Sequence, residues 1–536
     1  MQQPKAVIVS MEILADRQQT YAGGLGILAG DFVRSAKDLN LSIAGITLFY
    51  RHGYVRHHIE GRSIIDLPEK IDREVFEKVT SIKFDLKNGT RVEADVLKQK
   101  DVDCPVYYID TTPSKDEIIQ NVSERLYIEN SIEERLIKEL VLSIGALEAM
   151  NKLGFDPEKI HMNESHSVFI AIELFKREKN LEKIAKKLVF TTHTPLPHGH
   201  ERYDYKLVEK YYDIPDYIKK ISPNVLHLSR VANHFAGYTN AVSLKHSLVV
   251  RKLIPEISRA DWITNGIHHV RWSTPITQKF FDAYLPDWRS EPSKLVYATT
   301  IPFREILKLR QANKVEMITF LNERGYNSKD LDESGFTVVA RRRITGYKRL
   351  DMIFRNVERV EKLGRKYGLQ IVISGVAHPH DMDAKNMMKH FVDLTSMLKH
   401  AKLSLYFEKG YESERIIIAG GDLLLHTPLP PYEACGTSWM RASLNAVPVL
   451  SSRDGGVIEG IIDGYNGFLF GENLMEPKNV NNYNEFMNKL EYIAQLWTSD
   501  KKMYAEIARN AIRMISWFNS YRMVKEYWRR AYGFKD

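Results

Sequence analysis

Short apolar runs alternate with longer segments of helical periodicity along most of the 536-residue chain. Continuous runs of Val, Ile and Leu are typical of strands that are buried on both faces, as in parallel sheets. The alternation of such strands with helices therefore predicts an α/β fold with largely parallel sheets. The predicted strands lie at residues 6–13, 42–48, 106–109, 159–162 and 188–192 in the first half, and at residues 336–341, 369–374, 403–407, 423–426, 447–451 and 467–470 in the second.

The length of the chain and the distribution of its strands predict two domains. A chain of 536 residues is longer than one typical domain, and a second set of strands begins near residue 336. A polar segment with two prolines, residues 285–292, and a helix-like segment, residues 302–324, precede this set. We therefore predict an N-terminal domain of residues 1–295, a C-terminal domain of residues 296–510 and a final helical segment of residues 511–536.

The composition is that of a globular enzyme with a basic surface. Hydrophobic residues make up 44% of the chain and charged residues 27%, and the formal net charge is +8. The positive excess is either an ordinary solvated surface or an attraction for an anionic substrate such as a phosphate or a nucleotide. Acidic residues are interspersed with the basic ones along most of the chain, so we expect no nucleic-acid partner.

The cysteine content and the hydropathy of the chain indicate in which cellular compartment the protein works. The chain has two cysteines, Cys104 and Cys435, which excludes a disulfide framework and a zinc site made of thiolates. The first ten residues lack the features of a signal peptide, and no stretch of about 18 apolar residues occurs. We expect a cytoplasmic protein without a membrane partner.

Two segments combine features that bind anions. Gly23, Gly24 and Gly26 precede a helix-like stretch, so backbone amides there could contact a phosphate, although glycines also serve ordinary tight turns. A basic run that contains Arg343 and Lys348 directly follows a predicted strand. Ligands bind at the carboxyl ends of strands in open α/β sheets. We expect a phosphate site here, with a helix after Lys348 that adds its dipole; the alternative is a solvated basic loop.

Polar side chains follow several other predicted strands. His193, Asn265 and residues 163–166 supply imidazole and amide groups that can bind sugar hydroxyls, although a lone histidine is more often structural. His193 is also close in sequence to His198 and His200. No acidic pattern accompanies these three histidines, so we expect no metal site.

The segment from Glu433 to Arg441, Glu-Ala-Cys-Gly-Thr-Ser-Trp-Met-Arg, is the most informative in the chain. Gly436 and Thr437 are predicted to start a helix, which would place backbone amides beside the carboxylate of Glu433. A carboxylate and amides together match the hydroxyls of a sugar. The alternative is a carboxylate that only stabilises the helix N-terminus.

These motifs resemble, in order and spacing, those of the α-glucan phosphorylases, and in particular the short archaeal and bacterial branch. The resemblance covers roughly residues 6–470 and is carried by residues 23–26, 191–195, 264–266, 343–348 and 433–440. It implies a GT-B architecture, in which two Rossmann-like, doubly wound domains face a central cleft and the C-terminal helix crosses back to the first domain.

The resemblance also implies roles for individual residues. Glu433 and the amides near Gly436 would hold glucose hydroxyls, and Asn265 and His193 would lie near the 6-hydroxyl. The phosphate would face Arg343, Lys348 and the amides of Gly23 and Gly24.

Three departures from the phosphorylase pattern change the predicted reaction. Arg441 stands where phosphorylases carry the lysine that binds pyridoxal phosphate as a Schiff base, and no lysine occurs between Lys409 and Lys478. A guanidinium stays protonated and is a poor nucleophile, so it does not form that imine. Cys435 replaces a serine, and this is similar to bacterial glycogen and starch synthases. Residues 454–470 are similar to a segment of nucleotide-sugar transferases, although the glutamate with which many of these bind ribose is again Arg441.

We therefore predict a retaining α-glucosyltransferase that uses UDP- or ADP-glucose, with an α-glucan or a small sugar as acceptor and without covalent pyridoxal phosphate. One alternative is an α-glucan phosphorylase that binds pyridoxal phosphate non-covalently or works without it; another is a non-catalytic glucan-binding protein. The sequence does not determine the oligomeric state, and a homo-oligomer is one alternative. The predicted catalytic residues are Arg343, Lys348, Glu433 and His193, and the predicted substrate contacts are Gly23, Gly24, Asn265, Cys435, Gly436, Thr437 and Arg441.

Overall fold

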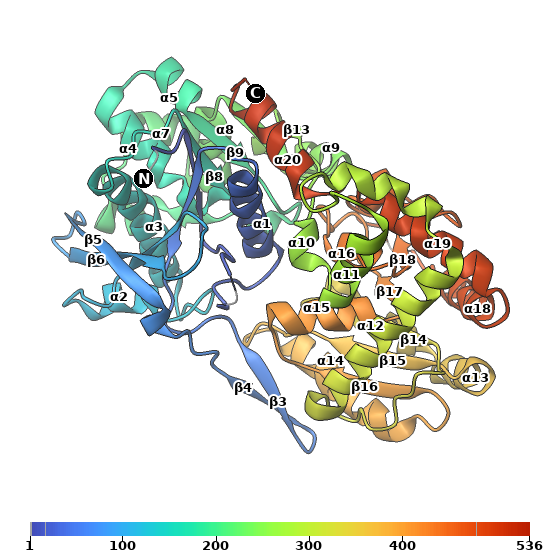
Figure 1. Cartoon of the computed structure of the whole chain (residues 1–536). Coiled ribbons are helices and arrows are strands. Elements are labelled where there is room, and N and C mark those ends of the chain that lie inside the picture. Colours follow the sequence, from blue (N-terminus) through green and yellow to red (C-terminus); the bar gives the residue numbers. More distant parts are fainter. Residues whose placement is uncertain (1–2, 17, 479, 536) are drawn as a thin grey trace. The chain divides into compact units, whose positions relative to one another are not determined.

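The computed structural model describes residues 3–16, 18–478 and 480–535, and the chain packs as two units (Figure 1). Unit 1 comprises Met1–Tyr54, Pro68–Thr264 and Met523–Asp536, and unit 2 comprises Val55–Leu67 and Asn265–Arg522. Each unit has its own sheet and its own core. None of the helices in the described part of the chain combines the length and the hydropathy that a membrane span requires.

Unit 1 is built on a nine-stranded sheet. Its strands pair in parallel from β13 through to β7, and only β6 and β5 at one edge are antiparallel. In spatial order the strands are β13 (Asp261–Trp262), β12 (Tyr238–Ala241), β9 (Leu188–Thr191), β8 (Lys159–Asn163), β1 (Ala6–Ser10), β2 (Ile43–Leu48), β7 (Val106–Asp110), β6 (Arg91–Gln99) and β5 (Phe76–Asp85).

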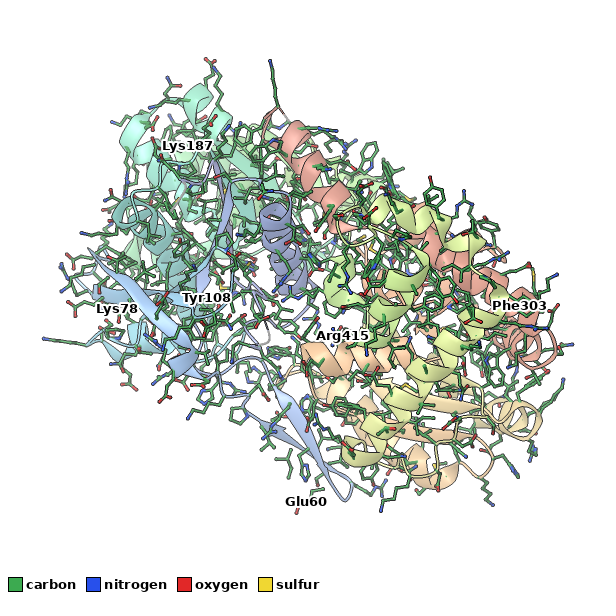
Figure 2. The ribbon with its side chains drawn as sticks, in the orientation of Figure 1. Glu60, Lys78, Tyr108, Lys187, Phe303 and Arg415 are labelled. Atoms are coloured by element: carbon green, nitrogen blue, oxygen red, sulfur yellow. The ribbon has the colours of Figure 1, made fainter. Side chains whose placement is uncertain are left out.

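Strands β1, β2, β7, β8 and β9 lie where apolar runs predicted them, which confirms the five strands predicted in the first half. Strand β12 is also largely buried, but its sequence, Tyr-Thr-Asn-Ala, is not an apolar run and did not predict a strand. Tyr108 of β7, for example, is fully buried, whereas Lys78 and Lys187 lie at the surface of the unit (Figure 2). Strands β5 and β6 were not predicted, because many of their residues are exposed and the apolar runs are interrupted.

The C-terminal residues of the chain belong to the core of unit 1. Helix α20 (Ser520–Glu526) leads into a helical turn, Tyr527–Ala531, rather than one long helix. The ring of Tyr527 stacks on His161 of β8 with 5.3 Å between ring centroids, and its hydroxyl accepts a hydrogen bond from the Asn240 side chain at 2.8 Å. The hydroxyl of Tyr532 lies 2.9 Å from Nδ1 of His161.

Unit 2 is built on a six-stranded sheet in which all pairs are parallel. All six strands were predicted from apolar runs. Counted along the chain, their spatial order is third, second, first, fourth, fifth, sixth, which is the order of doubly wound dinucleotide-binding folds. The strands are, in that order, β16 (Lys402–Tyr406), β15 (Gln370–Ser374), β14 (Thr337–Arg341), β17 (Leu423–His426), β18 (Val449–Ser452) and β19 (Phe468–Phe470).

Residues 265–295 pack with unit 2, so the predicted boundary at residue 295 lies inside this unit. The side chain of Asn445 accepts from the Thr274 amide at 3.1 Å and donates to the carbonyl of Trp272 at 2.9 Å. The polar segment with two prolines, residues 285–292, is therefore a turn within unit 2. Helix α12 (Phe303–Arg324) follows it where a helix was predicted.

A β-hairpin from the first part of the chain also belongs to unit 2. It consists of β3 (Arg56–Glu60) and β4 (Ser63–Leu67). The amide of Ala377 donates to Nε2 of His57 at 3.0 Å, and Lys385 Nζ lies 2.5 Å from Asp66 Oδ2. No apolar run predicted this hairpin, because most of its residues are exposed or half-buried. Its contacts with the rest of unit 2 lie about 320 residues away along the chain.

Candidate active site

The predicted sugar and phosphate residues of unit 2 gather at the point where its strand order reverses. Strands β14 and β17 are neighbours in the sheet, yet two strands separate them in sequence. Arg342 directly follows β14, and Glu433 lies on the loop after β17. Open α/β sheets bind ligands at the carboxyl ends of such strands, because the connecting helices diverge there.

Glu433 is a buried carboxylate held by two cations. Its Oε2 atom lies 2.5 Å from Lys348 Nζ and 2.7 Å from Arg342 Nη2. Its amide donates to Oδ2 of Asp454 at 2.8 Å. Burial alone would raise the pKa of this carboxyl, but Arg342 and Lys348 outweigh burial and hold the pKa well below its usual range. Glu433 is therefore ionised at neutral pH.

The arrangement lowers the pKa of Lys348. Burial and the neighbouring Arg342 lower the pKa of its ammonium group to about 7, and the attraction of Glu433 compensates only in part. Arg342 and Lys348 share the carboxylate of Glu433, so Lys348 loses its proton more easily than it would with a carboxylate of its own. An anion that entered here would restore the balance and raise the pKa of Lys348.

His426 and Gly436 form the wall beside Glu433. Nδ1 of His426 lies 2.9 Å from the Ser451 hydroxyl, whereas its buried Nε2 atom has no hydrogen-bond partner. Burial and the neighbouring Arg342 hold the pKa of His426 well below its usual range, so the ring is neutral. Gly436 has a φ of +69°, and a Cβ atom there would lie 2.6 Å from Nε2 of His426 and 3.2 Å from Oε1 of Glu433. Only glycine fits this position.

The basic run after β14 is divided between a buried and an exposed side. Arg342 is buried against Glu433, whereas Arg343, for which we predicted the catalytic role, is exposed. Sequence reasoning did not single out Arg342, because three consecutive arginines give no sign of which one points inward. The helix expected after Lys348 is also absent: short 3₁₀ turns follow, and helix α13 begins at Val357.

Cys435 and Asn265 lie close together beneath this site. Burial raises the pKa of the Cys435 thiol well above its ordinary value, and a hydrogen bond with the backbone of Asn265 opposes this shift. A Cβ atom on Gly456 would lie 2.5 Å from the Cys435 sulfur, and the amide of Gly456 donates to the carbonyl of Cys435 at 2.9 Å. The turn at residues 454–456 thus supports the loop that carries Glu433.

Arg441 lies on helix α16 (Ser438–Leu444) and is fixed by its surroundings. Its Nη1 atom donates to Glu414, its Nη2 atom donates to the Thr437 hydroxyl at 3.0 Å, and its guanidinium carbon lies 4.4 Å from the centre of the Trp272 ring. Arg441 therefore positions Thr437, which directly follows Gly436. Its donors are committed within the protein.

A lysine nevertheless lies near Arg441 in space. Lys409 is buried and acts electrostatically on Glu414, the partner of Arg441. Lys409 is 32 positions away from Arg441 in the sequence, so it is not a neighbour along the chain. Both residues therefore act on the same carboxylate, Arg441 by a hydrogen bond and Lys409 by its charge.

The predicted phosphate-binding glycines of unit 1 contact a carboxylate. The amides of Ala22 and Gly23 both donate to Oε2 of Glu12, the latter at 3.2 Å. Gly24 opens helix α1 (Gly24–Asp38), which confirms the predicted helix. A Cβ atom on Gly26 would lie 2.7 Å from the same oxygen of Glu12. A phosphate at the Gly23 amide would have to displace Glu12, a contact that no motif in the sequence indicated.

His193 is linked to the end of strand β8. Its Nε2 atom lies 2.8 Å from Oδ1 of Asn163, and its amide donates to Oε2 of Glu164 at 2.6 Å. Burial raises the pKa of Glu164 to about 8, while the His193 amide opposes this shift. Glu164 also has a φ of +74°, which is uncommon outside glycine and is typical of functional sites. Sequence reasoning noticed the motif of Glu164 but not this residue.

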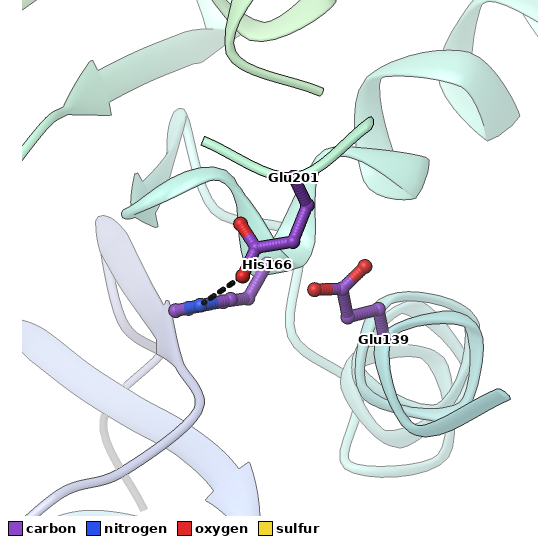
Figure 3. Close-up of side chains that lie close together, drawn as sticks. All are labelled: Glu139, His166 and Glu201. Atoms are coloured by element: carbon purple, nitrogen blue, oxygen red, sulfur yellow. Dashed lines mark ion pairs between the residues drawn. The ribbon is translucent and has the colours of Figure 1, made fainter. Parts of the chain in front are cut away.

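One group of potential metal ligands is present in the described part of unit 1: Glu139, His166 and Glu201 (Figure 3). A cation of the protein already lies among them, because Arg135 Nη2 is 2.6 Å from Glu201 Oε1 and 3.2 Å from His166 Nε2. Burial raises the pKa of Glu139 well above its usual range. We interpret the group as an ion-pair network around Arg135. Of the histidines considered for a metal, His200 bonds the Ser229 hydroxyl at 2.8 Å, and the side chain of His198 lies outside the described residues.

The predicted site residues are thus divided between the units. Gly23, Gly24 and His193 lie in unit 1. In unit 2, Lys348 and Glu433 are in contact, Gly436 adjoins them, Cys435 is next to Asn265, and Arg441 contacts Thr437.

Comparison with known proteins defines the class. The carbohydrate phosphorylase family model matches residues 227–495, and the starch synthase catalytic domain model matches residues 6–247. Maltodextrin phosphorylase of Thermococcus litoralis is 30% identical, over 95% of this chain and 68% of its own. Glycogen phosphorylase of Aquifex aeolicus is 28% identical, over 96% and 84%. An uncharacterized protein of Methanocaldococcus jannaschii is 27% identical, over 96% of both chains.

The fold and these matches define an enzyme of the glucosyltransferase type with the GT-B fold. The chain belongs to the carbohydrate phosphorylase family.

Proposed function

We propose that this protein is a retaining α-glucosyltransferase that transfers glucose from a nucleotide sugar to an α-glucan or a small sugar. The observation that carries the proposal is Arg441, which stands where the phosphorylases that the chain resembles attach their cofactor. Its guanidinium is bonded to Glu414 and Thr437 and packs on Trp272. A side chain so committed neither forms an imine nor leaves the space that an attached ring would need.

The electrostatics of the Glu433 site fit a departing phosphate. A phosphate that enters competes with Glu433 for Arg342 and Lys348, and it gains preorganised cations in a buried position, where they are most effective. Lys348, whose pKa is about 7 in the free protein, takes up a proton when the donor phosphate binds, and its ammonium group then stabilises the negative charge that develops on the leaving group. We propose that the exposed Arg343 contacts the outer oxygens of the same group.

We propose that Glu433 then binds the sugar. Once the phosphate takes over the two cations, the ionised carboxylate accepts hydrogen bonds from glucose hydroxyls, beside the neutral Nε2 of His426 and the open surface of Gly436. In unit 1 we propose that His193, held by Asn163, contacts the sugar. We nominate no protein nucleophile, so the acceptor hydroxyl would attack from the face that the phosphate leaves.

The second candidate function is phosphorolysis of an α-glucan. Two observations favour it: the similarity to maltodextrin and glycogen phosphorylases, and the buried Lys409 near Arg441. An aldehyde cofactor could react with Lys409 instead. A third candidate function is that of a non-catalytic glucan-binding protein. The intact Arg342–Lys348–Glu433 cluster argues against it, because buried charges cost desolvation free energy and such a protein would not need them.

A donor screen tests the proposal. The purified protein is incubated with UDP-glucose or ADP-glucose and with glycogen, maltodextrin or glucose, and the released nucleoside diphosphate is quantified. We expect release that depends on the acceptor and falls in Glu433→Gln. No release from any donor would contradict the proposal.

The cofactor is tested separately. We propose that the enzyme works without covalent pyridoxal phosphate. Incubation with pyridoxal phosphate, borohydride reduction and intact-mass measurement should leave the mass unchanged at sub-stoichiometric reagent. A single pyridoxyl adduct that maps to Lys409 or Lys348 would contradict it and favour phosphorolysis.

A further inference from the structure

A row of polar side chains crosses four neighbouring strands in the sheet of unit 1. Its members are register partners on β1, β8, β9 and β12: Ser10, Asn163, Thr191 and Asn240. Partners that lie directly opposite each other point to the same face of a sheet, and each of the four is at most 3% exposed. Strands that are buried on both faces normally carry apolar side chains there. We call these four residues the polar row.

Tyr527, from the C-terminal part of unit 1, completes a ring of hydrogen bonds with the polar row. The Thr191 hydroxyl donates to Oδ1 of Asn240 at 2.8 Å, and Nδ2 of Asn240 donates to the Tyr527 hydroxyl at 2.8 Å. The Tyr527 hydroxyl lies 3.3 Å from that of Thr191. Because the Thr191 hydrogen is used by Asn240, Tyr527 is the donor in this third bond. The three side chains therefore hold one another in place.

The same ring determines where the hydrogen of His161 lies. Nε2 of His161 is 2.7 Å from the Thr191 hydroxyl oxygen, which can only accept here, so Nε2 carries the hydrogen. Nδ1 then accepts from the Tyr532 hydroxyl at 2.9 Å. Burial lowers the pKa of His161 to about 3, so the ring is neutral and has a single hydrogen, as this arrangement requires.

Asn163 connects the polar row to His193. Its Nδ2 atom donates to the Ser10 hydroxyl at 3.0 Å, so its Oδ1 atom accepts from Nε2 of His193 at 2.8 Å. Burial holds the pKa of His193 well below its usual range, so the neutral ring has its hydrogen on Nε2 and an acceptor at Nδ1. Asn163 lies directly opposite Thr191, and the Glu164 amide donates to the Thr191 carbonyl at 2.8 Å. A shift of Thr191 therefore moves the residue that holds His193.

We propose that Tyr527 is a positioning residue for His193. Its hydroxyl fixes Thr191 and Asn240, and the polar row passes this order through Asn163 to the orientation and the tautomer of His193. Each member of a buried hydrogen-bond network depends on the others, so the loss of one hydroxyl loosens its neighbours as well. The effect of Tyr527 on the reaction rests on the proposed contact between His193 and the sugar, whereas its effect on the His193 ring does not.

The variant Tyr527→Phe tests the kinetic effect, because it keeps the ring that stacks on His161 and removes only the hydroxyl. We expect kcat/KM of whichever reaction the protein catalyses to fall by about 3–10-fold, the scale of one buried hydrogen bond. In a His193→Ala background the same change should cost less than about two-fold, because the group through which Tyr527 acts is gone.

Tyr212→Phe is the matched control. It removes a buried tyrosine hydroxyl of the same unit, which donates to Glu173 at 2.6 Å and lies outside the polar row. It should change kcat/KM by less than about two-fold in either background.

Nitrogen NMR of the full chain with ¹⁵N-labelled histidine gives a readout that needs no activity. The His193 signals are assigned by their loss in His193→Gln. We expect one tautomer, with the hydrogen on Nε2, in the wild type and in Tyr212→Phe, and a mixture of both tautomers in Tyr527→Phe. Thr191→Val removes the hydroxyl at the centre of the ring and should give the same mixture, which keeps the test decisive should Tyr527→Phe fail to fold.

Two results would overturn the proposal. One is a His193 tautomer that stays as in the wild type in the folded variants Tyr527→Phe and Thr191→Val. The other is a set of kinetic effects in which Tyr527→Phe and His193→Ala simply multiply, which would make the role of Tyr527 independent of His193. If His193→Ala alone keeps wild-type activity, the proposed sugar contact of His193 fails, and the tautomer decides the positioning role by itself.

Discussion

At the scale of single residues, Glu433 links the two cations of the candidate active site. Two cations within 2.7 Å keep it ionised although it is buried. A carboxylate in such a setting accepts hydrogen bonds from a ligand only after something else takes over its cations. A donor that carries a sugar and a phosphate supplies both changes at once.

Glu433→Gln should therefore reduce turnover of the nucleotide sugar more than binding of the free nucleotide. Glutamine keeps one acceptor oxygen but loses the charge, so Glu433→Ala should lose more activity than Glu433→Gln. Steady-state kinetics with the best donor and calorimetry with UDP or ADP measure the two effects. If nucleotide affinity falls as far as turnover does, Glu433 is not a sugar ligand.

The lowered pKa of Lys348 predicts a pH dependence of donor binding. The protonated amine binds phosphate, so below pH 7 the free enzyme holds the binding-competent form, and above pH 7 that form is depleted. The affinity for UDP-glucose, whose phosphates do not titrate in this range, should fall as pH rises from 6 to 8.5. Lys348→Met should bind weakly and without this slope. A wild-type affinity that is constant over the range would contradict the assignment.

Gly436 is a position where a single methyl group should be destructive. An alanine there would be strained at a φ of +69° and would meet His426 and Glu433. We expect Gly436→Ala to destabilise the protein by about 2–4 kcal/mol and to abolish activity. Gly346→Ala is the control, since a Cβ atom at Gly346 meets nothing within 4 Å. Urea unfolding compares the two, and equal stabilities would show that the site is not so tightly packed.

At the scale of elements, the strands made of apolar runs were predictable, whereas the more polar strands and the contacts between distant segments were not. Each of the eleven predicted strands is present, because apolar runs in an α/β protein have few other uses. The convergence of β14 and β17 could be anticipated from the motifs that follow them. The choice of Arg342 over Arg343, the carboxylate of Glu12 at the glycine amides and the spatial approach of Lys409 depend on packing between distant segments. No local pattern records such contacts.

The hairpin β3–β4 illustrates this limit and gives a prediction at the same scale. His57→Ala removes the acceptor of the Ala377 amide, so hydrogen exchange at Ala377 should become faster, by about 10-fold or more, for a loss near 1.4 kcal/mol. Arg62→Ala removes only an exposed ion pair with Asp393 and should leave this exchange rate unchanged. Unchanged exchange in His57→Ala would show that the hairpin does not stabilise unit 2.

At the scale of the whole molecule, two related family models match different parts of the chain. The match to carbohydrate phosphorylases covers residues 227–495, and the match to starch synthases covers residues 6–247. The sequence pattern predicted the fold class and the family, because both rest on strand order and motif spacing. The boundaries of the units differ from the predicted domains, since the chain enters unit 2 with the hairpin and returns to unit 1 at its end.

The most direct test of the central claim compares the two reactions in the same preparation. One sample receives glycogen and inorganic phosphate, and glucose 1-phosphate is measured; the other receives UDP- or ADP-glucose with glycogen, and the nucleoside diphosphate is measured. Our account predicts transfer from at least one nucleotide sugar at a rate well above that of phosphorolysis. Robust formation of glucose 1-phosphate without turnover of either nucleotide sugar would contradict it.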